Sequence, residues 1–157
     1  MWFFMILCYL MSLLTFFLLL LNGLQGYVHF KIFQANHATL AILTIILYLF
    51  TKTLIIFYFV GIGVSIKEFM IDNKKSGDYH KRIIGVKRRI YPPLLLNMLL
   101  VMVLFISGGA VDTKHIAGWI HGLLFYISVI HFAKTAVIEH QSFKESANIV
   151  IEMAKQA

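Results

Sequence analysis

Residues 37–65 read HATLAILTIILYLFTKTLIIFYFVGIGVS, an apolar run in which Lys52 is the single formal charge. About 20 apolar residues in an α-helix cross a hydrocarbon core of about 30 Å. This run therefore predicts a transmembrane helix. Because the run is longer than the bilayer requires, the helix is expected to tilt or to protrude.

Three further apolar runs predict spans over residues 2–21, 92–111 and 115–138. The first has no basic segment and no cleavage site of a signal peptide, so we expect a retained helix. The third is expected to begin at Pro92-Pro93, since proline is tolerated in a first helical turn. The tail 139–157 has apolar residues at the spacing of an amphipathic helix on the membrane surface. The sequence thus predicts one all-α membrane domain, a four-helix bundle with a C-terminal amphipathic segment.

The connector 66–91 carries most of the positive charge between the predicted spans. Residues 67–89 hold eight Lys or Arg against three Asp or Glu. Lys and Arg concentrate in cytoplasmic loops and attract anionic lipid headgroups, so this loop and both termini are predicted on the cytoplasmic side, with no nucleic-acid partner. A composition of 60% hydrophobic and 13% charged residues leaves no soluble catalytic domain. We expect an energy-transducing membrane, the bacterial inner membrane or its organellar equivalent.

Polar residues within the spans are the candidate functional residues, because burying them in lipid costs free energy. At 100° per residue, one stripe of the second span gathers His37, Thr44, Tyr48, Thr51 and Lys52. A face of the fourth span gathers His121, Leu124, Ser128, His131 and Thr135, and the third span contributes Asn97. Such faces are expected to point into the bundle or toward a partner subunit.

Lys52 lies near the middle of its span, and no predicted span contains Asp or Glu. An unpaired ammonium there costs about 2.5–3.5 kcal/mol on insertion scales. Four explanations are open. The side chain snorkels to the headgroups, is neutral in a dry site, pairs with a ligand carboxylate such as a haem propionate, or pairs with an acid of another subunit.

A bis-histidine b haem needs ligands from two helices at the same depth. The first and third spans contain no histidine, so the candidate pairs join His37 to His121 or to His115. His131 lies about 15 Å below His121, with no histidine of another span at its level. Its expected role is therefore a hydrogen bond within the bundle. This arrangement allows, but does not require, one haem as cofactor and metal site, with His37 and His121 as its ligands.

The basic segment, the third span, the short turn and Trp119-Ile120-His121 together resemble four-helix haem-handling membrane proteins. These include small b-type cytochromes and the bacterial membrane protoporphyrinogen oxidase. In that oxidase an intramembrane lysine closely follows the tryptophan–histidine pair. Here Gly122 and Leu123 follow, and the nearest lysine of the span is Lys134.

The sequence contains no nucleophile motif, no phosphate-binding glycine loop and no paired-cysteine metal motif. The leading prediction is a small membrane subunit of a redox complex that binds one b haem and is not an enzyme on its own. Its partners would be lipid and other membrane subunits. One alternative is a cofactor-free structural or assembly subunit, with Lys52 turned toward a neighbour. Another is an enzyme like protoporphyrinogen oxidase.

Overall fold

Four long helices make up most of the chain. The computed structural model describes residues 2–32, 34–73 and 78–155. The helices are α1 (Trp2–Val28), α2 (His37–Asp72), α3 (Asp78–Asp112) and α4 (Gly118–Ala154). Each is long and apolar enough to cross a membrane. The predicted all-α, integral membrane four-helix bundle is therefore confirmed.

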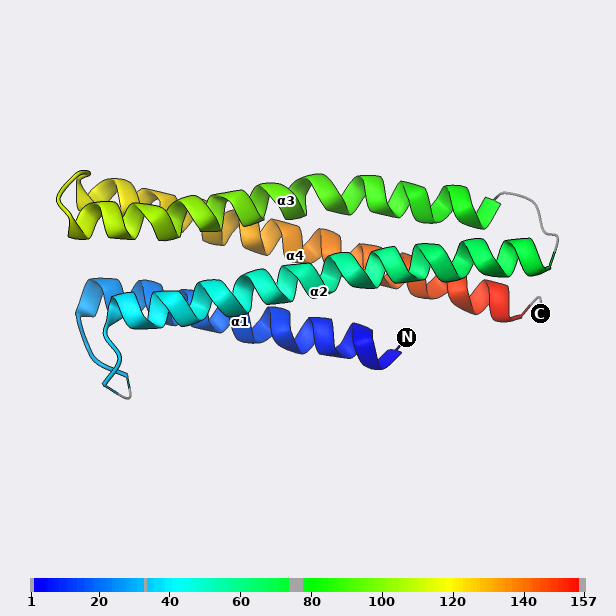
Figure 1. Ribbon diagram of the computed structural model, residues 1–157, viewed down its shortest axis with the longest axis horizontal. Helices are drawn as coiled ribbons and strands as arrows, with labels where there is room; N and C mark the ends of the chain where they lie inside the picture. Colours follow the sequence, from blue (N-terminus) through cyan, green and yellow to red (C-terminus); the bar gives the residue numbers. More distant parts are fainter. Residues whose placement is uncertain (1, 33, 74–77, 156–157) are drawn as a thin grey trace.

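The helices run up and down in sequence order (Figure 1). α1 packs on α2, α2 on α3, α3 on α4, and α4 closes the bundle on α1. Both termini lie toward the end of the bundle that carries the α2–α3 connection (Figure 1). We call this the extension end, and it comprises residues 66–72, 78–91 and 139–154. The opposite end, which holds His37 and His121, is called the histidine end.

The helices at the extension end are longer than predicted. α2 continues to Asp72, and α3 begins at Asp78 rather than at Pro92, so both prolines lie inside a helix. A proline in a helix removes one backbone hydrogen bond. Packing on either side offsets this loss, because Ile90 and Leu94 flank the prolines and are both fully buried. The connector predicted over residues 66–91 is mostly helical, and residues 74–77 lie outside the described residues.

The predicted C-terminal helical segment is the continuation of α4. Its inward side chains pack in the bundle rather than lie on the membrane surface. Eight buried positions follow each other at intervals of four and three residues, the spacing of a coiled-coil seam, with Phe143 and Ala147 buried beside them: Ser128, Phe132, Thr135, Glu139, Ser142, Ser146, Ile149 and Met153. This seam runs through residue 138 without a break, so the span and the tail form one helix.

Candidate functional site

His37 and His121 meet at the histidine end. Asn36 caps α2 by accepting a hydrogen bond from the Thr39 amide at 2.9 Å, which fixes the first turn with His37 on it. His121 stands in the first turns of α4. Their ring centres are 6.1 Å apart, and the ring planes cross at 84°. The structure therefore brings together the two histidines that sequence analysis paired.

A serine of α3 determines which nitrogen of His121 carries the proton. Ser107 Oγ lies 2.7 Å from the Leu104 carbonyl and 2.8 Å from His121 Nδ1. A hydroxyl has one proton, and the carbonyl can only accept, so Ser107 donates to Leu104. His121 Nδ1 is then the donor to Ser107. The Nε2 atom of His121 is left with a free electron pair, the form that ligates a metal.

Asn22 of α1 plays the corresponding part for His37. His37 Nδ1 lies 3.1 Å from the Asn22 backbone carbonyl, to which it donates. The side-chain amide of Asn22 is also close, and with its nitrogen turned inward it would donate to Nδ1 at 2.7 Å. Ligation through Nε2 requires the first arrangement, in which Nδ1 carries the proton. Asn22 and Ser107 are thus the partners that orient the two rings, and sequence analysis missed both.

Glycines allow the helices to approach the two rings closely. A Cβ atom at Gly26 would lie 3.1 Å from His37 Cε1, and one at Gly108 would lie 3.3 Å from His121 Cε1. Both rings border an open groove of about 660 Å³ between the ends of α1, α3 and α4. Glycine permits close backbone approach to a ligand. The groove is also bordered by a third histidine, His29, and by Gly23, Tyr27, Val111, Asp112, Gly118, Trp119, Gly122, Leu123, Phe125 and Tyr126.

The described residues contain no group of three His, Cys, Asp or Glu side chains that could hold a metal ion. A structural zinc site normally needs four such ligands. A haem needs only two axial ligands, since its porphyrin supplies the other four nitrogens. Two metal–nitrogen bonds of about 2 Å, extended to the ring centres, span about 6.4 Å. The observed separation of the ring centres is 6.1 Å, which matches this value for rings whose Nε2 atoms face each other.

Lys52 is paired within the chain, which none of the four explanations foresaw. Its Nζ donates to Glu139 Oε1 at 2.6 Å, and the two side chains are 0% and 4% exposed. The ammonium also lies over the Phe132 ring, 4.4 Å from its centre. The statement that no span contains an acid was wrong, because the predicted fourth span ended one residue before Glu139. The coiled-coil spacing of α4 was the signal that could have placed Glu139 inside the bundle.

The other predicted polar residues lie along the bundle axis. Tyr48 donates to Asn97 Oδ1 at 2.6 Å, and Asn97 Nδ2 donates to the Ser128 carbonyl at 3.3 Å, which joins α2, α3 and α4. Thr44 returns its hydroxyl to its own helix at the Leu40 carbonyl. His131 is partly buried, and its Nδ1 lies 3.3 Å from the Thr135 hydroxyl. These residues form hydrogen bonds between helices or within their own helix. None of them forms a second pair of histidines.

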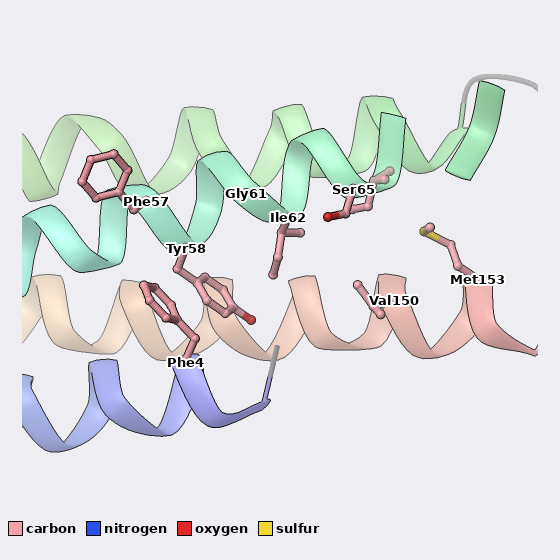
Figure 2. A pocket seen from close by; sticks show the side chains of 9 residues that line it. Phe4, Phe57, Tyr58, Gly61, Ile62, Ser65, Val150 and Met153 are labelled. Carbon is pink, nitrogen blue, oxygen red and sulfur yellow. The ribbon is translucent and has the colours of Figure 1, made fainter. Parts of the chain in front are cut away.

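A separate groove of about 480 Å³ opens between α1, α2 and α4 near the extension end. Figure 2 shows Phe4 and Tyr58 facing each other across it, with Gly61 and Ser65 further along α2. The two rings stack with centres 6.3 Å apart. Most of its lining is apolar, and the Tyr58 hydroxyl is within 3.4 Å of Ser146 Oγ. This groove offers no pair of ligands or titratable groups for chemistry.

Comparison with known proteins gives no relative of this chain: no family model, no curated protein and no solved structure matches it. The case for a function therefore depends on the histidine end itself.

Proposed function

We propose that the protein is a small integral membrane subunit of a redox complex and that it binds one b-type haem between His37 and His121. The observation that supports this most is the state of the two rings. Each Nδ1 lies within hydrogen-bond distance of a partner, the Asn22 backbone carbonyl for His37 and the Ser107 hydroxyl for His121, and the ring centres are 6.1 Å apart. Metal-ligating histidines almost always donate their other ring N–H in this way.

When bound, haem would take up and release a single electron. The chain's own residues would supply the ligands, fix their orientation and provide space for the porphyrin. His37 and His121 would ligate the iron through Nε2, Asn22 and Ser107 would hold the rings, and the glycine-lined groove would admit the macrocycle. With both histidines as ligands, the iron would keep no open position for a substrate, which would suit electron transfer better than catalysis.

The membership in a larger complex is proposed on a different basis from the one the sequence suggested. An unpaired Lys52 had favoured a partner subunit, but its charge is satisfied by Glu139 inside the bundle. The support now comes from the histidine end, where Trp119 is 71% exposed beside the groove, and Tyr27 and Tyr126 are also exposed. Tryptophan and tyrosine are enriched in protein interfaces, and at the boundary of a membrane they also contact the lipid headgroups.

The test is the absorption spectrum of the purified protein after reduction with dithionite. We expect the sharp α band of a six-coordinate b haem, and its loss in His37→Ala and in His121→Ala. His131→Ala is the matched control, because His131 lies on the same helix but away from the pair, and this variant should keep the band. If the wild-type protein neither retains haem nor binds added haemin, the cofactor-free subunit becomes the better explanation.

A further inference from the structure

A third groove lies between the first turns of α1 and the extension-end part of α4. Its volume is about 410 Å³. One wall is aromatic and apolar and comes from α1: Trp2, Met5 and Tyr9. The other comes from α4 and combines three polar side chains with two apolar ones: His140, Lys144, Ala147, Asn148 and Ile151. A wall of hydrogen-bond donors facing an apolar wall suits a molecule with a polar head and an apolar body.

The polar wall is one continuous stripe of α4. His140, Lys144 and Asn148 follow each other at intervals of four residues, so they lie above one another on the helix surface, and all three are exposed. The Tyr9 hydroxyl and His140 Nδ1 are 2.9 Å apart, which closes the groove at its inner end. The Nζ of Lys144 is a donor further along the same stripe.

On this face of α4, the positive charge of Lys144 is not paired with an acid among the described residues. The acids of the neighbouring flank are paired with α3, since Glu145 accepts from Arg89 at 2.7 Å and Glu152 accepts from Arg82. Within residues 2–32, 34–73 and 78–155, no carboxylate lies within ion-pair distance of Lys144. The groove therefore favours an anionic head.

The level of the groove matches the lipid headgroups. Apart from Lys134, the exposed side chains of α4 before His140 are largely apolar, as at Ile130 and Val137, and from His140 onward they are mostly polar, with Ile151 the large apolar exception. This change marks the boundary of the hydrocarbon core on this helix. Tryptophan and tyrosine are enriched at that boundary, and Trp2 and Tyr9 stand there on α1.

We propose that this groove is a binding site for one anionic phospholipid. The phosphate would accept hydrogen bonds from Lys144 and Asn148, and the acyl chains would follow the apolar surface of α1 into the bilayer. Lys144 favours an acidic headgroup, and the aromatic wall of α1 favours acyl chains. Both lie at the level of the lipid headgroups, so an acidic phospholipid is the expected occupant. The inference does not depend on haem binding.

The experiment is native mass spectrometry of the detergent-purified full chain, with phosphatidylglycerol and phosphatidylcholine of the same acyl chains as probes. The wild-type protein should retain one phosphatidylglycerol in preference to phosphatidylcholine. Lys144→Gln should reduce that preference about fivefold, the effect of one lysine near an anionic surface. Glycerol 1-phosphate, which has the same head without the chains, should not displace the lipid at equal concentration.

Lys81→Gln is the matched control, because Lys81 is an exposed lysine of α3 outside the groove. It removes the same charge and should leave the preference unchanged. Helical content measured by circular dichroism should be equal in the three proteins. Equal losses in Lys144→Gln and Lys81→Gln would show attraction by net charge alone and would overturn the site. Equal retention of the two lipids by the wild-type protein would do the same.

Discussion

At the histidine end, glycines border an open groove and two imidazole rings approach each other beside it, whereas the helices at and near the extension end bury a larger apolar cluster with two further grooves along its sides. The larger buried cluster includes Phe59, Ile66, Ile90 and Phe143, which come from α2, α3 and α4. The cluster nearer the histidines has five buried members, including Leu19 and Leu104. Between the two clusters lies the ion pair of Lys52 and Glu139. The comparison separates an end whose helices share a large apolar cluster from an end whose helices leave a groove beside two histidines.

The largest expected effect comes from removing the acid between the two ends. Glu139→Ala leaves the Lys52 ammonium buried without its partner, which typically costs about 3–5 kcal/mol in the free energy of unfolding. Thermal unfolding in detergent, followed by circular dichroism, measures this. The double variant Lys52→Met with Glu139→Leu should recover most of the loss, since it buries no charge. If Glu139→Ala were as stable as the wild type, the ion pair of Lys52 and Glu139 would not be formed in the membrane.

The second prediction adds a methyl group at Gly23, in the wall of the groove at the histidine end. In Gly23→Ala the added Cβ would lie 2.1 Å from Phe125 Cζ, so the ring must move into the groove. Overpacking of this kind costs about 1–3 kcal/mol. Gly109→Ala is the control, because nothing lies within 4 Å of its added Cβ. It should stabilise α3 by up to about 1 kcal/mol through helix propensity. Equal unfolding temperatures for the two variants would contradict the packing at Gly23.

The third prediction separates ligand binding from stability. Ser107→Ala removes the acceptor of the His121 Nδ1 proton, and loss of such an orienting partner typically weakens metal affinity 10–100-fold. Titration of the apoprotein with haemin measures the change, and thermal unfolding should show a much smaller effect. Unchanged haemin affinity in this variant would mean that Ser107 does not orient His121 for ligation.

The smallest effect is expected at the surface of the extension end. Arg89→Ala breaks the pair with Glu145, in which both side chains are partly exposed. Exposed ion pairs contribute about 0–1 kcal/mol, and salt screens them. The unfolding temperature should therefore fall slightly at low salt and match the wild type at high salt. A loss comparable to that of Glu139→Ala would show that the extension depends on surface charge rather than on its apolar core.

The sequence was sufficient for the four helices because apolar runs of this length have few other structures. It was also sufficient to pair His37 with His121, since few histidines lie at matching depths. It failed at the ends of the helices. Where a helix leaves the hydrocarbon core, its outer face becomes polar while its inner face continues to pack. A hydropathy average combines the two faces of the helix. The prediction therefore ended the fourth span at residue 138 and began the third span at Pro92.

The parts of the site that were not predicted are contacts between helices. Ser107 lies near the end of an apolar run, where nothing in the sequence distinguishes it. The predicted first span ended at residue 21, just before Asn22, whereas α1 continues to Val28. Their roles follow from the side-by-side packing of α1 with α2 and of α3 with α4. A single sequence specifies which face of a helix is buried, but the rotation of each helix against its neighbour decides which buried groups touch.

The ion pair also constrains how the protein is made. Lys52 and Glu139 are 87 positions apart in the chain. At a synthesis rate of about 5–20 residues per second, Lys52 is synthesised roughly 4–17 s before Glu139. During that interval α2 carries an unmatched ammonium, so it must remain at the insertion machinery or keep Lys52 at the headgroups. Stable integration of the second helix then awaits the fourth, and a nascent chain stopped after α3 should be extracted from the membrane more readily than the complete one.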